Sequence, residues 1–282
     1  MSAVTVDNEL VHYEVLGRGR PVIFVHGWLG SWRYWIKTMQ QLSAKFRTYA
    51  LDLWGFGDSS KEFSPGEDRY SLDQQVALLA GFMERMGIDR AALVGHGLGA
   101  AVVVKFAAAN PSRVPRTVVI SPPVLGSWLS PELLDSSLAH LSALAARNAA
   151  DLSVLEAEVA KADGDAVRCS ALNIRGEGGD SAPIDLRPLV LRILDTETAP
   201  PNMLMALHGA QDTLVRYPDD NTLNGLEQHE RFIFIVLENS RHFPMLDESA
   251  KVNRLITEFL ELAPGQALKD LQPKDRWHRR MR

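Results

Sequence analysis

The sequence predicts an α/β protein built on one mostly parallel, doubly wound sheet of eight strands, and two patterns predict it. Short apolar runs without polar alternation recur along the chain, as expected for strands buried on both faces. Helical patterns lie between these runs, which implies right-handed crossovers and a mostly parallel sheet. The chain has 282 residues, 46% hydrophobic and 23% charged. That length and composition suit one globular domain with a large sheet.

The chain opens with an expected antiparallel hairpin, whose strands at Val4–Val6 and Val11–Val15 flank Asp7 and Asn8. Six further apolar runs are expected to form the buried strands. They are Pro21–Val25, Arg47–Leu51, Ala91–Val94, Arg116–Ile120, Met203–Leu207 and Arg231–Val236. The expected helices of the sheet layers are Trp32–Leu42, Leu72–Met86, Ala100–Ala109 and Ser249–Leu262.

The regular alternation stops between Pro122 and Pro201. Two helix-like stretches, Pro131–Arg147 and Asp151–Ala162, precede a glycine-rich loop there. We therefore predict a core domain of residues 1–123 and 200–263 and an inserted helical lid of residues 124–199. A lid at this place covers the carboxyl ends of the strands, where open α/β sheets bind ligands. Residues 264–282 are expected to be a basic, solvated tail, or alternatively a docking arm for a partner.

Composition excludes several classes of function. The formal net charge is -5, so no whole-protein field attracts nucleic acid or an anionic membrane. We expect a cytoplasmic protein, because the first residues lack a signal-peptide pattern and no apolar run is long enough to span a bilayer. The single cysteine, Cys169, is expected to be a small core residue. No metal site is expected, because no Cys/His cluster has zinc spacing.

Two glycine-containing segments follow predicted strands early in the chain. The first is His26-Gly27-Trp28-Leu29-Gly30, where glycine permits a sharp turn and the Trp28 amide can donate to a developing oxyanion. We also expect His26 and Gly27 to contact substrate. The second segment, from Asp52 to Ser59, suits a tight, internally hydrogen-bonded loop, so we expect it to support the site structurally.

The third segment, Gly95-His96-Gly97-Leu98-Gly99, has the spacing of the nucleophile elbow G-x-S-x-G, with Gly97 at the centre in place of serine. Its His96 is a further candidate for contacting substrate. No cofactor is expected, since this turn lacks the G-x-G-x-x-G spacing and the Walker lysine.

Two residues late in the chain are the candidates for a catalytic pair. Asp212 and His242 each follow a predicted strand, and the order elbow, acid, histidine is that of a hydrolase triad. Asp219 and Asp220 are rivals for the acid, but they stand in a run that resembles a turn or helix cap.

These ordered segments resemble the α/β-hydrolase superfamily, from Val4 to Leu262, and within it the branch of esterases, C–C bond hydrolases, epoxide hydrolases and haloalkane dehalogenases. The resemblance implies that His242 is a general base oriented by Asp212, and that the amides of Trp28 and Leu98 form an oxyanion hole. It implies a small apolar, ester-like ligand; we expect a monomer or homodimer. Epoxide hydrolases and dehalogenases use aspartate at the apex of the elbow, where the other enzymes use serine. Gly97 therefore matches neither group.

Glycine has no atom that can attack a carbonyl, so a covalent acyl-enzyme route cannot run through position 97. Three functions remain open. In the first, the chain is a serine hydrolase disabled by an engineered or natural loss of its nucleophile, with trace esterase activity. Alternatively, it uses His242 and Asp212 as a non-covalent general base, or it is a pseudoenzyme that binds a small apolar ligand.

Overall fold

The computed structural model describes residues 2–63, 68–177, 182–198, 201–218, 223, 225–263, 268 and 271. Within these residues the sheet has eight strands in the order β1-β2-β4-β3-β5-β6-β7-β8. The strands are β1 (Ser2–Val6), β2 (Glu9–Gly17), β3 (Arg20–Val25), β4 (Phe46–Leu51), β5 (Ala92–His96), β6 (Arg116–Ile120), β7 (Met203–Gly209) and β8 (Phe232–Leu237). All pairings from β4 to β8 are parallel. The predicted eight-stranded, mostly parallel fold is confirmed.

The N-terminal hairpin forms as expected, because Asp7 and Asn8 both take the positive φ that a two-residue hairpin turn requires. Central strands of the sheet are fully buried: every residue of β5, β6 and β7 is buried. That burial accounts for their continuous apolar runs, since both faces of these strands are covered by helices.

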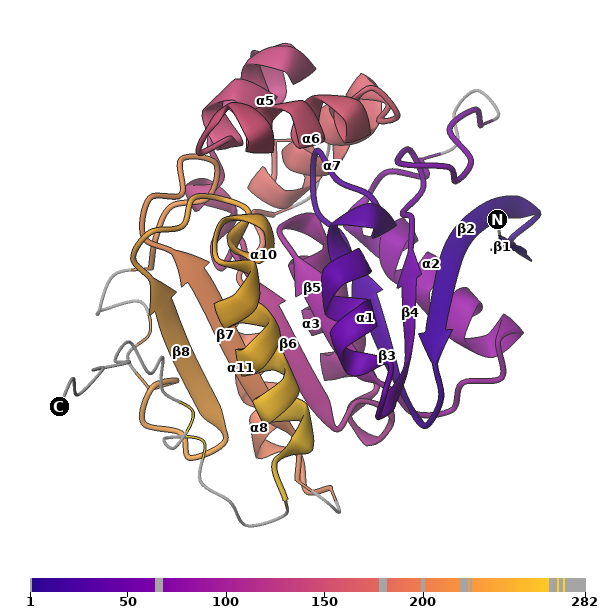
Figure 1. The fold of residues 1–282 in the computed structure, drawn as a ribbon, viewed down its shortest axis with the longest axis vertical. Helices are drawn as coiled ribbons and strands as arrows, with labels where there is room; N and C mark the ends of the chain where they lie inside the picture. The colour runs from indigo at the N-terminus through magenta and orange to yellow at the C-terminus, as the bar shows by residue number, and fades with distance from the viewer. Residues whose placement is uncertain are drawn as a thin grey trace, which may run out of the picture.

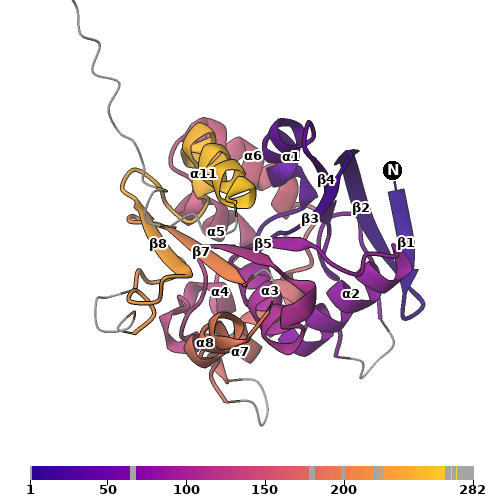
Figure 2. The same cartoon turned by 90° about the horizontal axis from the view of Figure 1, so that it is seen from below.

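Helices cover the two faces of the sheet. Figure 2 shows α1 (Ile36–Leu42) and α11 (Ser249–Glu261) on one face, with α2 (Leu72–Arg85), α3 (Leu98–Ala109) and α8 (Arg187–Asp195) on the other. The Trp32–Leu42 stretch begins as a 3-10 turn, Trp32–Trp35, before α1. Among the described residues, no helix has the length and apolar character needed to span a bilayer.

Four helices of the insertion, α4 (Glu132–Asp135), α5 (Leu138–Ala145), α6 (Ala149–Val159) and α7 (Gly164–Arg175), precede α8. Figure 1 shows α5, α6 and α7 above one end of the sheet, and we call the segment from α4 to α7 the cap. By contrast, α8 packs against α3 and β7. We propose that the covering part ends before α8, within the predicted insertion of residues 124–199.

Three details of the insertion differ from the expectation. Pro131–Arg147 is not one helix, because Ser136 is extended and Ser137 caps a new helix by accepting a hydrogen bond from the His140 amide. Helix α7, which begins after the N-cap Asp163, was not expected. Cys169 on α7 is exposed rather than a core residue.

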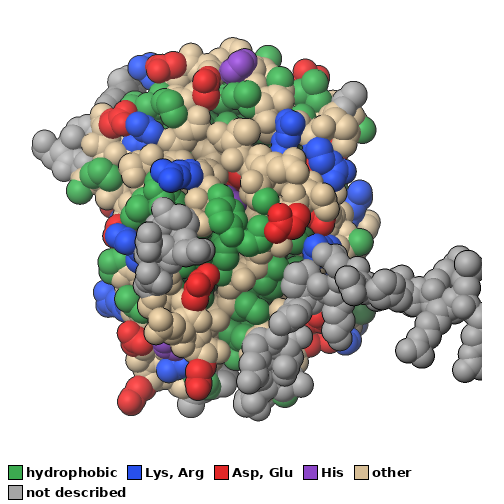
Figure 3. Space-filling view, turned by 90° about the vertical axis from the view of Figure 1, so that its left-hand side faces the viewer, with side chains coloured by type: hydrophobic (Ala, Val, Ile, Leu, Met, Phe, Trp, Pro, Cys, Tyr) green, Lys and Arg blue, Asp and Glu red, His purple; other side chains and the backbone are tan. Residues whose placement is uncertain are grey.

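Beyond Ala263 the chain is described only at Leu268 and Leu271, which are both buried in the hydrophobic core. The predicted basic tail of residues 264–282 otherwise lies outside the described residues. Figure 3 shows hydrophobic side chains running down the face that carries the edge strand β8. On β8, Ile233, Phe234 and Val236 are half-buried.

Candidate active site

The strand order positions the site. The chain leaves β3 toward β4 on one side, and β5 lies on the other side of β3. Such a reversal opens a crevice at the carboxyl ends of the strands, because the connections on its two sides run in opposite directions. The His26–Gly30 segment follows β3 and the elbow follows β5, so the topology brings these two segments together.

Asp212 and His242 form a buried hydrogen-bonded pair. Asp212 lies three residues after β7, and His242 lies five residues after β8. The His242 Nδ1–H donates to Asp212 Oδ2 over 2.8 Å, and both side chains are 0% exposed. With its proton on Nδ1, the imidazole presents the bare Nε2 as a base. That Nε2 atom is buried and has no hydrogen-bond partner within the described part of the chain.

The Asp212 carboxylate is held in its ionised form. Its Oδ1 accepts hydrogen bonds from the amides of Leu214 and Val215, at 2.9 and 3.0 Å. Burial would raise the pKa of Asp212, but the charge and hydrogen bond of His242, the nearby His208 and the Val215 amide lower it to about 2. The carboxylate is therefore suited to orient His242 and to stabilise its protonated form.

The elbow has the geometry that its glycine pattern predicts. Gly97 has φ 50° and ψ −116°, a conformation that L side chains rarely adopt. A Cβ on Gly95 would collide with the Gly99 carbonyl, and one on Gly99 would collide with the carbonyls of Val25 and His26. Glycines at positions 95 and 99 therefore allow the turn to pack directly against the end of β3.

The apex of the elbow faces the free nitrogen of the histidine. An ideal Cβ built on Gly97 would lie 3.3 Å from His242 Nε2 and 3.3 Å from Trp28 Cε3. A hydroxyl on that Cβ would therefore come within hydrogen-bond reach of Nε2 once the neighbours shift by a few tenths of an ångström. The structure thus brings together Gly97, Asp212 and His242.

The two segments that carry the predicted oxyanion donors meet at this apex. Leu98 is the first residue of α3, and no side chain caps that helix at Gly97. The uncapped N-terminus of a 12-residue helix therefore carries unpaired N–H groups and a partial positive charge beside the apex. Gly27, next to Trp28, packs against the elbow, since a Cβ on it would lie 3.1 Å from the Gly97 Cα. Both predicted oxyanion donors, Trp28 and Leu98, thus belong to segments that meet at Gly97.

His26 supports the loop rather than a ligand. Its Nε2 accepts a hydrogen bond from the Leu53 amide at 3.0 Å, and its Nδ1 bonds the Gly27 carbonyl at 2.9 Å. Burial lowers its pKa, partly offset by Asp52, so the ring is neutral. A substrate contact through either nitrogen would break one of these bonds. We therefore propose that His26 supports the loop and does not bind substrate through its nitrogens.

His96 is hydrogen-bonded to the backbone of His242. Its Nε2–H donates to the His242 carbonyl over 2.7 Å, and the two rings lie 4.6 Å apart. Burial and the neighbouring His242 hold the pKa of His96 well below its usual range. His96 is thus a neutral support for the backbone of His242. Its Nδ1 is buried without a hydrogen-bond partner among the described residues and lies 2.9 Å from an ideal Cβ on Gly27.

The Asp52–Ser59 segment is the internally bonded support that its sequence suggests. Asp52 is fully buried, and its carboxylate accepts the amides of Trp32 and Asp58, at 2.8 and 2.9 Å. His12, Asp52 and Asp58 together are close enough to ligate a cation. However, His12 Nδ1 already bonds Asp52 at 3.0 Å, and we assign the group to loop structure.

The residues that match the α/β-hydrolase fold family model are 20–152. The chain is 34% identical to the (lyso)-N-acylphosphatidylethanolamine lipase of Mus musculus over 36% of its length, and 33% identical to the soluble epoxide hydrolase of a Corynebacterium strain over 39%. These matches span 30% and 37% of the relatives, or about a third of their length. The enol-lactonase of Burkholderia xenovorans superposes with a TM-score of 0.73 at 19% identity, covering 92% of this chain and 99% of the other. The chain has the α/β-hydrolase fold, and its sequence resembles that superfamily over residues 20–152.

Two kinds of residue at this site are not apparent from the sequence. Ser170 and Glu158 of the cap bond the segment that carries Trp28. Ser121, directly after β6, has φ 46° and a buried hydroxyl without a partner among the described residues, which marks it as a strained polar group at the edge that carries the site. The rival acids Asp219 and Asp220 lie outside the described residues.

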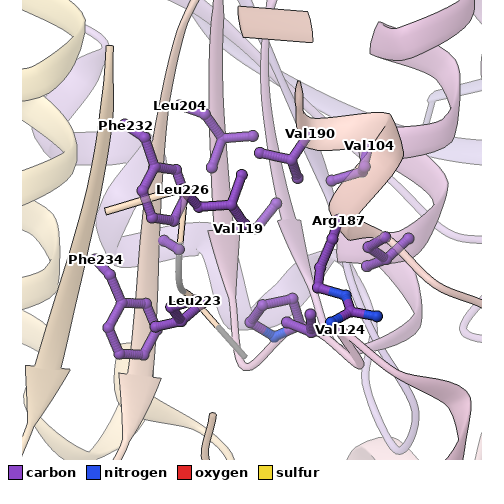
Figure 4. A pocket seen from close by; sticks show the side chains of 13 residues that line it. Val104, Val119, Val124, Arg187, Val190, Leu204, Leu223, Leu226, Phe232 and Phe234 are labelled. Carbon is purple, nitrogen blue, oxygen red and sulfur yellow. The ribbon is translucent and has the colours of Figure 1, made fainter. Parts of the chain in front are cut away.

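A separate apolar pocket lies between the sheet and α8 (Figure 4). Its thirteen lining residues include none of the elbow, the catalytic pair or the loop after β3. They are Val104, Val119, Pro122, Val124, Leu186, Arg187, Val190, Leu204, Ala206, Leu223, Leu226, Phe232 and Phe234. The charge of Arg187 at this pocket is already paired with Asp185 at 2.7 Å, so the pocket offers no free cation.

Proposed function

We propose that this chain is related to serine carboxylic-ester hydrolases and that Gly97 has removed their nucleophile. The observation that carries the proposal is the unpaired Nε2 of His242, 3.3 Å from where a side chain at position 97 would begin. A nitrogen without a partner in that position is what a triad leaves behind when its hydroxyl is deleted. We favour ester chemistry over epoxide opening because the predicted oxyanion donors, the amides of Trp28 and Leu98, belong to segments that meet at Gly97 and would suit a carbonyl oxyanion.

The remaining groups can still assist a reaction, but weakly. In a serine hydrolase the histidine takes the hydroxyl proton and the acid keeps the histidine oriented. Deleting the nucleophile of a protease triad lowers turnover by roughly 10⁶, or about 8 kcal/mol of activation free energy. What survives, from the oxyanion donors and from binding, is about 10³ to 10⁴ over water. We therefore expect trace hydrolysis of a small apolar ester.

The test is the Gly97→Ser variant assayed with short-chain p-nitrophenyl esters. The proposal predicts a gain of several orders of magnitude over the parent chain, and loss of that gain in Gly97→Ser/His242→Ala. Gly87→Ser is the matched control, because Gly87 also has a positive φ but an added Cβ there meets nothing within 4 Å. A Gly97→Ser variant that folds and hydrolyses no faster than Gly87→Ser would contradict the proposal.

The same unpaired nitrogen also favours a second candidate, a general base that acts on a water or a substrate hydroxyl without covalent catalysis. That candidate predicts a product whose rate disappears in His242→Ala and is unchanged in Gly97→Ser. Ligand affinity that survives His242→Ala, with no turnover of esters, lactones or epoxides, would instead favour a binding protein.

A further inference from the structure

Residues of the core domain hold the segment that carries Trp28 in place. The Tyr34 hydroxyl donates to the Leu29 carbonyl over 2.6 Å, which holds Leu29 at a positive φ of 62°. The amide of Trp32 donates to the buried Asp52 carboxylate. A non-glycine residue at positive φ is strained, so this segment needs such anchors to keep its shape.

Helix α7 of the cap supplies a further anchor. The indole Nε1–H of Trp28 donates to Ser170 Oγ over 2.9 Å, and both side chains are buried. The Ser170 hydroxyl in turn donates to the Ala166 carbonyl at 2.6 Å, so its proton is committed and its lone pair faces the indole. The Trp28 ring also lies beside the apex at Gly97. A single cap serine thus fixes the ring that borders the reaction site.

Helix α6 supplies an anchor of its own through a buried carboxylate. The Ser31 hydroxyl donates to Glu158 Oε2, and the Arg33 guanidinium lies 3.6 Å from the same oxygen. Glu158 is 6% exposed and Ser31 is 0% exposed. Moving the cap away would break this buried bond and leave the Ser31 hydroxyl with only the Arg33 amide and the Glu158 carboxylate with only Lys161 as polar partners among the described residues, so the bond favours the docked cap.

We propose that Glu158 and Ser170 are positioning residues, which hold residues 28–33, and with them the Trp28 amide, in the geometry of an oxyanion donor. Docking of the cap and assembly of the oxyanion site are then one event, because the same two bonds make both. The cap completes the site instead of only covering it. We call the two bonds from the cap, Trp28 to Ser170 and Ser31 to Glu158, the clamp. The part of this inference that concerns an oxyanion rests on the proposed function. The existence of the clamp does not.

The first experiment measures the clamp without any reaction. The indole ¹⁵N–¹H signal of Trp28 is assigned by its loss in Trp28→Phe, and deuterium uptake is followed over residues 27–34. Ser170→Ala and Glu158→Ala are expected to raise that uptake rate by about tenfold or more, the equivalent of one lost hydrogen bond. Ser170→Ala is also expected to shift the Trp28 indole signal.

Matched controls are available within the cap. Ser142 is a buried cap serine whose hydroxyl bonds only its own helix, at the Leu138 carbonyl, and Glu156 is an exposed residue of α6. Ser142→Ala and Glu156→Ala should leave the indole signal and the uptake over 27–34 unchanged. Ser170→Thr and Glu158→Gln, which keep the accepting oxygen, should restore parent behaviour. Uptake that is equal in Ser170→Ala, Glu158→Ala and the parent would overturn the clamp.

The second experiment tests the oxyanion role in the Gly97→Ser background. Oxyanion donors act on the transition state, so Glu158→Ala should lower kcat for p-nitrophenyl acetate by about tenfold or more with little change in KM. A changed KM with unchanged kcat would overturn the positioning role. If Gly97→Ser itself hydrolyses no ester, the proposed function fails, and the exchange and indole measurements still decide the clamp.

Discussion

Replacing Gly97 by alanine should destabilise the protein more than the same change at Gly87. Both glycines have positive φ, 50° and 63°, so both variants force a Cβ into a disfavoured backbone region. An added Cβ at Gly87 meets nothing within 4 Å, whereas at Gly97 it would lie 3.3 Å from both His242 Nε2 and Trp28 Cε3. Gly87→Ala therefore measures the backbone strain alone, and Gly97→Ala adds the displacement of two buried rings.

Backbone strain of this kind costs about 1–3 kcal/mol. In a chain of this size each kcal/mol lowers Tm by about 2–4 °C. We expect Gly87→Ala to lose about 1 kcal/mol, and Gly97→Ala to lose at least about 1 kcal/mol more, which is a further 2–4 °C or so in a thermal unfolding curve. The reasoning is refuted if Gly97→Ala melts at or above the temperature of the parent, because the apex would then carry no such constraint.

Three further predictions follow from the buried groups. Burial lowers the pKa values of His26, His96 and His208, so their contribution to stability is present above the ordinary histidine pKa of about 6.5 and declines at lower pH. We therefore expect Tm to fall between pH 7 and 5, with net proton uptake on unfolding. A Tm that does not change over this range would contradict the prediction. The pKa of Asp212 is lowered from 3.8 to about 2, which stabilises the fold by about 2 kcal/mol above pH 3.8. This stabilisation is lost as pH falls toward 2, so Tm should fall less steeply with acid in Asp212→Asn than in the parent. Equal slopes of Tm against pH in the two chains would count against the prediction. Gly99→Ala should fail to give folded protein, because its Cβ would collide with backbone carbonyls at the end of β3; a soluble variant with parent-like circular dichroism would show that the elbow packs differently.

The fold was predictable because each central strand is buried on both faces and so leaves an unbroken apolar run. Arg116–Ile120 is the clearest case, since the predicted run and β6 have the same bounds. The first hairpin was predictable for a local reason, the Asp7-Asn8 pair, which tolerates positive φ.

The insertion was harder to predict because its helices are short and capped in ways that interrupt the pattern. Ser137 starts a new helix where the apolar spacing alone suggested continuity. Helix α7 begins with Gly164, a poor helix former, and is specified by its cap Asp163 and its packing. Helix α8 does carry a signal, the buried spacing of Val190, Ile193 and Leu194, but its place beside α3 depends on contacts far apart in sequence.

The sequence predicts which residues come together at the site, but not which residues hold them in place. Chain order alone pairs Asp212 with His242 and places Gly97 at the apex, because the carboxyl ends of parallel strands meet at one edge. The roles of Ser170 and Glu158 depend on where the cap docks, and neither residue stands in a motif. His26 illustrates the same limit: its motif predicts a ligand contact, and the sequence does not show that both of its ring nitrogens bond backbone groups of the turn after β3.

Covalent labelling tests the account most directly. A small organophosphonate that reacts only with activated serines is added to the parent chain, to Gly97→Ser and to Gly97→Ser/His242→Ala, and intact masses are recorded. The account predicts one adduct on Gly97→Ser, mapped to position 97, and none on the other two chains. An adduct on the parent chain, or an unlabelled but folded Gly97→Ser, would contradict the claim that His242 faces a site that lacks only its nucleophile.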